Sequence, residues 1–294
     1  MKKVILDCDN TIGVKRSDID DGLTFAYLYA NPDIDLLGIT CTFANNHEHV
    51  CYYNTIQMME DLEITDVPVL KGGRNPEEYN SDAVDFLVKS ANEAPGEITV
   101  IAIGSLCNIA GAYTKDPLFF QKIQKLIVMG GILEPLYLNG VANPELNFSV
   151  DYKSAVKVLY HCSCLTVMSA QCTKEAVYGE EDVKMLLAQN TRFMNRYVTV
   201  IRDWIAHITH RYGNRPIFIN WDLCCAIYLT HPELFQDNLR RIVAKEENMK
   251  TGWMQEDKAC EYPDNEVVSI NIPDKILNLD AFNKEFYTMM KRMK

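Results

Sequence analysis

Long apolar runs are missing from this sequence of 294 residues. No stretch approaches the roughly 18 consecutive apolar residues that a membrane-spanning helix needs. The basic start Met1-Lys2-Lys3 is followed by a short apolar run that ends at Asp7, which is too short for a secretory signal peptide. We therefore expect a cytoplasmic protein that does not associate with a membrane.

Positive charge is scarce as well. The chain has 29 Lys and Arg against 40 Asp and Glu, which gives a formal net charge of −11 at pH 7. A surface that binds nucleic acid needs clustered Lys and Arg to replace the counterions of the phosphates. The charge balance argues against a nucleic-acid partner and favours a small neutral molecule as the substrate.

The sequence also has no linker rich in Pro, Gly or Ser and no internal repeat. With 48% hydrophobic and 23% charged residues it is an ordinary globular chain, long enough for one large core. We therefore predict a single domain, residues 1–294. The ten cysteines lie mostly in apolar contexts, which favours free buried thiols over disulfides.

Short apolar runs typical of buried strands alternate with helical patterns along most of the chain. We expect strands at 4–6, 34–42, 67–70, 98–103, 125–129 and 164–168, with further strands near 242–243 and 266–272. We expect helices at 20–29, 53–62, 82–94, 152–160 and 195–212, and a last helix from residue 280. This alternation predicts an α/β fold with a doubly wound, mostly parallel, mixed sheet flanked by helices.

Four carboxylates follow the first predicted strand, Val4-Ile5-Leu6. Asp7 and Asp9 come directly after it, and Asp20 and Asp21 begin the first predicted helix. Ligands of α/β sheets bind at the carboxyl ends of strands, and converging like charges repel unless a cation or a shared proton compensates them. Hard oxygen ligands favour Ca²⁺ or Mg²⁺ over zinc.

Two families carry such a stretch. Residues 6–11, Leu-Asp-Cys-Asp-Asn-Thr, resemble the DxDxT motif of haloacid-dehalogenase-type phosphatases, in which the first Asp, here Asp7, is the nucleophile. Extended to Gly22, the stretch resembles the DxDxGxDD signature of calcium-dependent nucleoside hydrolases. That signature leaves three residues between its second and third Asp, whereas ten lie between Asp9 and Asp20, so seven residues are extra.

Later motifs separate the two families. Residues 38–46 resemble the GITxxxGN segment of the hydrolases, with Asn45 in place of Gly, and residues 103–108 resemble their TGPLTN loop. Residues 129–131 resemble their MGG, residues 145–151 their EFNxxxD, and Trp221-Asp222 lies where they have His-Asp or, in purine-specific members, Trp-Asp. Five motifs in this order resemble the inosine-uridine type nucleoside hydrolases, which hydrolyse the N-glycosidic bond of ribonucleosides.

The resemblance implies a metal site and a general base. Ca²⁺ would be held by Asp9, Asp21, Asp222 and the main-chain carbonyl of Ile103. Asp9 would take a proton from the attacking water, and Asp7 would orient the metal-binding carboxylates.

It also implies a nucleoside site. Asp20 and Asn46 would hold the 2-hydroxyl side of the ribose, Asn147 and Asp222 the 3-hydroxyl, and Glu145 and Asn139 the 5-hydroxyl, with Met129 beneath the sugar. Trp221 would stack on a purine base and help it to leave. A homodimer or homotetramer is implied by the resemblance alone.

Alternatives stay open at this stage. The chain could be a phosphatase that uses Asp7, or a non-catalytic relative that binds ribose. The seven extra residues could displace Asp9 from Asp20 and spoil the metal site, or they could fold outward as a surface loop, as Lys15-Arg16-Ser17 suggests. Trp221 and Met129 could instead belong to the core, and the apolar stripe of the helix at 195–212, which includes Trp204, is more typical of core packing than of a binding site.

Overall fold

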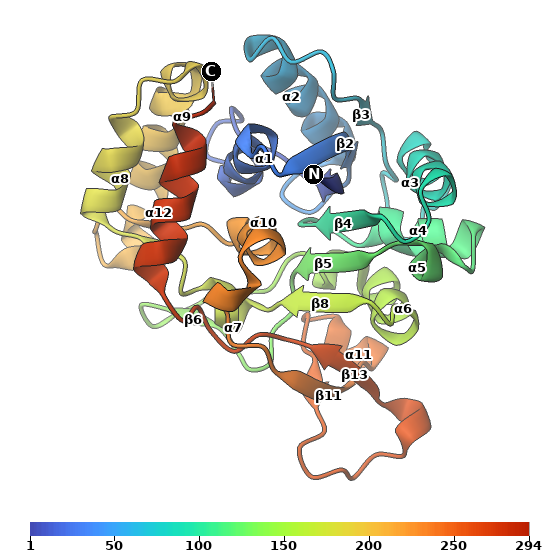
Figure 1. Cartoon of the computed structure of the whole chain (residues 1–294). Helices are drawn as coiled ribbons and strands as arrows, with labels where there is room; N and C mark the ends of the chain where they lie inside the picture. Colours follow the sequence, from blue (N-terminus) through green and yellow to red (C-terminus); the bar gives the residue numbers. More distant parts are fainter. Residues whose placement is uncertain (294) are drawn as a thin grey trace.

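A nine-stranded mixed sheet forms the centre of the computed structural model, which describes residues 1–293. The strand order is β12-β11-β13-β8-β5-β4-β1-β2-β3 (Figure 1). All neighbouring pairs from β13 to β3 are parallel, and β11 is antiparallel to both β12 and β13. The predicted α/β class with a mostly parallel, mixed sheet is confirmed.

Except for β12, which was not predicted, the strands of this sheet lie close to the predicted positions. Their bounds are β1 Lys2–Cys8, β2 Ile34–Cys41, β3 Val69–Leu70, β4 Ile98–Ala102, β5 Lys125–Met129, β8 Leu165–Met168, β11 Leu239–Val243, β12 Gln255–Glu256 and β13 Val268–Asn271. Two short antiparallel pairs lie outside the sheet: β6 Tyr137–Leu138 with β7 Val141–Ala142, and β9 Val177–Tyr178 with β10 Phe218–Ile219.

The helices also follow the predicted alternation. They are α1 Asp20–Ala30, α2 Glu48–Asp61, α3 Asp82–Glu93, α4 Cys107–Lys115, α5 Phe119–Lys122, α6 Tyr152–His161, α7 Ala170–Thr173, α8 Glu180–Leu187, α9 Arg192–Ile208, α10 Leu223–Thr230, α11 Glu246–Met249 and α12 Leu279–Met290. The predicted helix at 195–212 ends early, because residues 209–212 form a separate 3₁₀ turn. No helix among residues 1–293 is long and apolar enough to cross a membrane.

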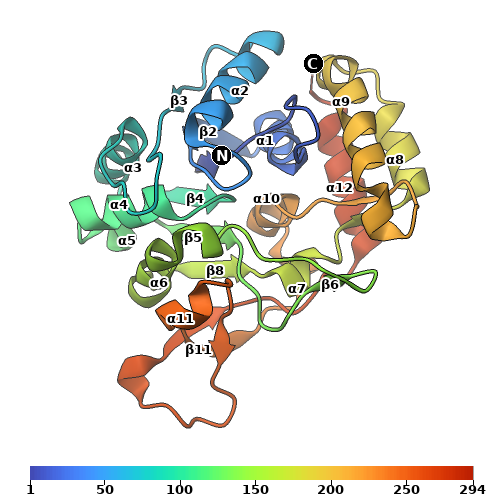
Figure 2. The same ribbon diagram turned by 180° about the vertical axis from the view of Figure 1, so that it is seen from behind.

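The side chains of the central strands alternate between two hydrophobic cores, as the period of two along a strand requires. Val4 and Leu6 of β1 face the core that includes side chains of α1, α9, α10 and α12, whereas Ile5 faces the core beneath α3, α4 and α6. These two groups of helices lie on opposite sides of the sheet in Figure 1, and Figure 2 shows the same layers from behind.

The order of the strands determines where a ligand can bind. The chain runs from β1 outward through β2 to β3, then returns to the other side of β1 with β4 and continues through β5 and β8. The direction of winding therefore reverses between β1 and β4, and a crevice forms at the carboxyl ends of strands at such a point. Asp9 follows β1 and Ile103 follows β4, so both lie at this crevice.

Candidate active site

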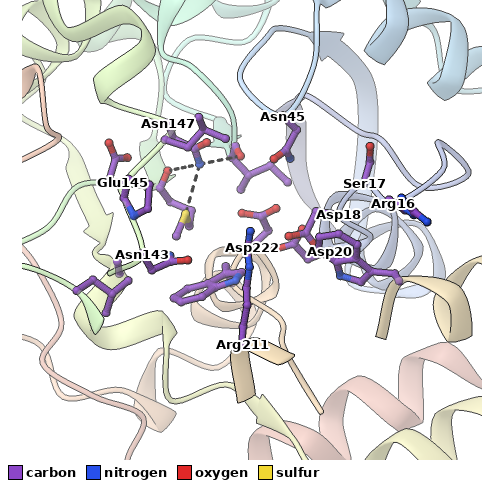
Figure 3. Close-up of a pocket in the computed structure, with 18 residues that line it drawn as sticks. Arg16, Ser17, Asp18, Asp20, Asn45, Asn143, Glu145, Asn147, Arg211 and Asp222 are labelled. Atoms are coloured by element: carbon purple, nitrogen blue, oxygen red, sulfur yellow. Dashed lines mark hydrogen bonds between the residues drawn. The ribbon is translucent and has the colours of Figure 1, made fainter. Parts of the chain in front are cut away.

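A pocket of about 310 Å³ opens at the carboxyl ends of the central strands (Figure 3). Its walls come from the loop after β1, the loop after β2, the ends of β4 and β5, the segment between β7 and α6, helix α9 and the residues just before α10. Predicted site residues that line it are Asp20, Ile103, Met129, Glu145, Asn147, Trp221 and Asp222. The sequence motifs therefore converge on one cavity.

Three carboxylates form a cluster at this pocket, and two of them, Asp20 and Asp222, line it. Asp20 and Asp21 begin α1, and Asp222 directly precedes α10. One carboxylate oxygen of each lies within 4.8 Å of the others, and all three residues are buried. Asp21 and Asp222 are two of the predicted metal ligands; Asp20, predicted to bind the ribose, lies with them, and Asp9 is not one of the three.

Asp9 lies next to Asp21 of the cluster but does not line the pocket, and Asn45 holds its carboxylate. The backbone N–H of Asn45 donates to Asp9 Oδ2, and Asn45 Nδ2 lies 3.5 Å from Asp9 Oδ1 and 3.2 Å from Asp21 Oδ2. The backbone N–H of Asp9 donates to Asp21 Oδ1 at 3.1 Å. A Cβ on Gly104 would lie 2.9 Å from Asp9 Oδ1, so the close packing here requires glycine.

Burial dominates the electrostatics of these acids. It raises the pKa of Asp20, Asp21 and Asp222 well above the ordinary value, and repulsion from the neighbouring carboxylates raises them further. Burial also raises the pKa of Asp9, to about 7. Buried oxygen donors that repel one another in this way suit a hard divalent cation, because the cation removes the repulsion. The residues thus fit a metal site.

Asn46 was predicted to bind the ribose, but it lies outside the pocket. Its Oδ1 accepts the backbone N–H of His47 at 2.9 Å, ahead of α2, whereas Asn45 lines the cavity. Counted from Gly38, the pattern GITxxxGN places its Gly at Ala44 and its Asn at Asn45. The motif could therefore have identified the right residue, and the expected position was wrong by one.

Asn139 is a second correction. It is exposed, has a φ of 49° and forms the turn of the β6–β7 hairpin with Gly140. An Asn-Gly pair suits such a two-residue hairpin because both residues tolerate positive φ. Asn143, on the segment that follows the hairpin, lines the pocket instead.

Asn147 connects the ends of β4 and β5. Its Nδ2 donates to the carbonyl oxygens of Ile103 at 3.0 Å and Met129 at 3.1 Å, and lies 3.3 Å from the Met129 sulfur (Figure 3). Because Asn147 contacts the Ile103 carbonyl, the predicted metal-binding carbonyl and the predicted ribose-binding amide lie side by side. Met129 is partly buried and forms part of the same wall.

Glu145 lines the pocket, but its carboxylate is also a structural anchor. Oε1 accepts the backbone N–H groups of Gly131 at 3.1 Å and Phe148 at 2.8 Å, and Oε2 accepts that of Ser149 at 2.9 Å. Burial raises its pKa despite these donors. Glu145 thus holds the loop before α6 against the end of β5.

Two indole rings also line the pocket. Trp221 packs on the small apolar cluster of Ile132, Leu136 and Ala170 and faces the cavity. Trp204 belongs to the stripe of α9 that we expected to be core; it packs partly on the core and also lines the pocket. Arg211, from the turn after α9, points toward Asp222 in Figure 3.

The seven extra residues do not fold away from the pocket. Arg16, Ser17 and Asp18 line it, and backbone hydrogen bonds from Val14 to Thr11 (2.9 Å) and from Ser17 to Val14 (3.2 Å) make the loop compact. The loop returns to α1 with Asp20 and Asp21 beside Asp222. Neither expected alternative describes it fully, since the acidic cluster survives and the loop becomes a wall of the site.

Comparison with known proteins settles the family. A family model described as inosine-uridine preferring nucleoside hydrolase matches residues 4–283. The chain belongs to this family. The hydrolase is 25% identical over 266 residues to probable uridine nucleosidase 1 of Oryza sativa subsp. japonica, which covers 79% of this chain and 78% of the relative. It is 24% identical over 267 residues to uridine nucleosidase 1 of Arabidopsis thaliana, covering 80% and 75%.

Solved structures show the same fold. The hydrolase matches the plant nucleoside hydrolase PpNRh1 with a TM-score of 0.86 at 18% identity, over 99% of both chains. It matches a purine-preferring ribonucleoside hydrolase from Gardnerella vaginalis with a TM-score of 0.84 at 20% identity, again over 99% of both chains. The predicted family and the predicted class of enzyme, a ribonucleoside hydrolase that cleaves glycosidic bonds, are confirmed.

The position of Asp7 agrees with this family and contradicts the phosphatase alternative. Its carboxylate is fully buried, and Oδ2 accepts hydrogen bonds from Thr40 at 2.6 Å and Asn108 at 2.8 Å. It does not line the pocket of the hydrolase. A nucleophile must reach its substrate, whereas Asp7 instead holds β2 through Thr40 and the start of α4 through Asn108.

Proposed function

We propose that this chain hydrolyses purine ribonucleosides to ribose and the free base, and that it does so with a bound Ca²⁺. The observation that carries the proposal is the pocket itself, which is lined both by two carboxylates of a buried cluster of three and by two indole rings. The acidic side suits a sugar that becomes positively charged, and the aromatic side suits a flat base.

Asp20, Asp21 and Asp222 would hold the ion, together with the main-chain carbonyl of Ile103, and Asp9 would complete the set from behind. When bound, the ion would supply a water of lowered pKa and would orient the ribose hydroxyls. Asp20 and Asp222 line the pocket directly, so each can also accept a hydrogen bond from the sugar. Asn147 and Met129 would contact the sugar from the strand ends.

Asp9 is the proposed general base. Burial raises its pKa to about 7, close to the pH at which a base works best. Asn45 lines the pocket in front of it and donates to both Asp9 and Asp21. Asn45 would therefore control whether water reaches the Asp9 carboxylate, and its amide could turn toward the 2-hydroxyl of the ribose.

The departing base must leave as a stable species. Trp221 directly precedes Asp222, so its ring lies within one residue of the acidic cluster and faces the same cavity. Stacking on the ring would make a purine easier to protonate at its imidazole nitrogen, and a pyrimidine lacks that nitrogen. This reasoning favours purine nucleosides, and Trp204 offers a second aromatic surface.

The test is direct. The protein, freed of metal and then given Ca²⁺, should release ribose and hypoxanthine from inosine faster than ribose and uracil from uridine, and thorough chelation should abolish both reactions. Full activity after chelation would show that the reaction does not need the metal. Release of phosphate from a nucleotide, with nucleosides left intact, would refute the proposed function.

We also propose that the chain assembles as a homodimer or homotetramer. This rests on the family alone. Multi-angle light scattering at micromolar concentration would measure it, and a monomer of 33.6 kDa would refute it.

A further inference from the structure

A second cavity of about 490 Å³, which we call the groove, adjoins the active-site pocket. It runs between the inserted loop, which supplies residues 13–17, and helix α9, which supplies Val200, Asp203, Trp204, Ala206 and His207. Arg16, Ser17 and Trp204 line both cavities. The two cavities therefore adjoin one another, and the wall between them is made partly by the residues that the family signature lacks.

The groove adjoins the base side of the pocket and not the 5-hydroxyl side. Glu145 and Asn143 do not line the groove, and Figure 3 shows them on the side of the pocket opposite Arg16. Asn147, Met129 and Asp222 do not line it either. Because the proposed ribose contacts do not line the groove, we expect a substituent that enters it to extend from the nucleobase.

The groove has half-buried apolar side chains and exposed positive ones. Val14, Val200 and Trp204 are half-buried, and the exposed Lys15 and Arg16 bring two positive charges against one negative charge, that of Asp203. Within residues 1–293 no ion pair includes any of these three charged side chains. In a chain of net charge −11, two unpaired cations beside the active site are available to a ligand.

We propose that this groove is a subsite for an anionic substituent on the nucleobase, such as a carboxylate joined through a short chain to the exocyclic amine of a purine. The apolar side chains would cover the connecting chain, and Lys15 and Arg16 would pair with the carboxylate. This inference rests on the nucleoside hydrolase function proposed above. It assigns the inserted loop a role in choosing the substrate.

The experiment compares two substrates that differ only in charge: N6-carboxymethyladenosine and its neutral amide, N6-(carbamoylmethyl)adenosine. At low salt kcat/KM for the acid should exceed that for the amide by about two- to fivefold, the usual range for exposed ion pairs. The difference should appear in KM, because the contact is the same before and during the reaction. The ratio of kcat/KM for the acid to that for the amide should approach one at 1 M salt, where charges are screened within about 3 Å.

Two variants that change the charge of the groove in opposite directions test the residues. Lys15→Gln should lower the ratio of acid to amide, and Asp203→Asn, which removes the one acid of the groove, should raise it. Neither residue lines the active-site pocket, so turnover of inosine should not change. Lys89→Gln, an exposed lysine on α3 that lines neither cavity, is the matched control.

The outcomes separate this subsite from the proposed function. Hydrolysis of inosine with a ratio of one or less, or with neither derivative cleaved, would overturn the subsite and leave the function standing. A ratio above one that neither variant shifts would also overturn it. Failure to cleave any nucleoside would refute the proposed function and this inference together.

Discussion

The ring of Trp221 offers the sharpest test of how the base leaves. In Trp221→Ala the pocket would lose one of its two indole surfaces, while Asp222, the next residue, keeps its carboxylate. The base would then have no stacking partner on that side. We expect the rate on purine nucleosides to fall and the metal site to persist.

The magnitude follows from stacking. An aromatic pair contributes about 0.5 to 1.5 kcal/mol beyond burial, which corresponds to roughly a two- to thirteenfold loss in kcat/KM at about 1.36 kcal/mol per factor of ten. Loss of leaving-group activation adds to this. The cost in folding should stay below the about 3 to 5 kcal/mol of a fully buried aromatic, since the ring is only partly buried against Ile132, Leu136 and Ala170.

Steady-state rates on inosine, guanosine and uridine would be measured for wild type, Trp221→Ala and Trp221→Phe. Trp253→Ala is the matched control, because that indole is 38% exposed and lies outside the pocket. The increase in Tm on adding Ca²⁺ should be the same in all four proteins. Full purine turnover in Trp221→Ala, or a wild type that favours uridine, would show that the ring belongs to the core and that the leaving group is activated elsewhere.

Three further predictions concern the acids. Asp9→Asn should lower kcat by about 10²- to 10⁴-fold, the usual contribution of a general base, with little change in Tm; a kcat near that of wild type would mean another base. Because burial raises the pKa of Asp9 from 3.8 to about 7, and those of Asp20, Asp21 and Asp222 as well, the folded metal-free protein binds more protons than the unfolded chain. Its stability should therefore fall as the pH rises from about 4 to 7, and Ca²⁺ should raise Tm more at pH 8 than at pH 5; equal increases at both would contradict the repulsion argued for the cluster. Inosine should be hydrolysed much faster than its 5-monophosphate, because Glu145 would face a dianion, and comparable kcat/KM values on the two would refute that placement.

Local pattern was enough to predict most of the fold. The strand at 98–102 begins with four β-branched residues, and helix α3 begins where Ser81 accepts the backbone N–H of Val84. Such elements depend on neighbours in sequence. The rule that ligands bind at carboxyl strand ends then placed the acids after β1 and the Ile103 carbonyl after β4 at one crevice.

The order of the motifs was also enough for the family and for most of the pocket. Asp20, Asp222 and Trp221 come from segments about 200 residues apart, yet all three line one cavity, as the resemblance implied. The sequence could not show which of the acids lie closest together, because the distance between carboxylates depends on the path of every loop. It predicted Asp9 as a ligand beside Asp21 and Asp222, whereas the three carboxylates that lie closest together are those of Asp20, Asp21 and Asp222.

Only the tertiary structure decided where the side chains of loops point, and whether a helix side chain between two neighbouring segments faces the core or a cavity. Asn139 has the residue type and spacing of a site residue, but the hairpin turn that it forms carries it away from the pocket. Trp204 has the spacing of a core residue, and the inserted loop packed beside α9 gives it a second face on the cavity. The path of that loop depends on contacts with residues almost 200 positions away, and no local pattern records such contacts.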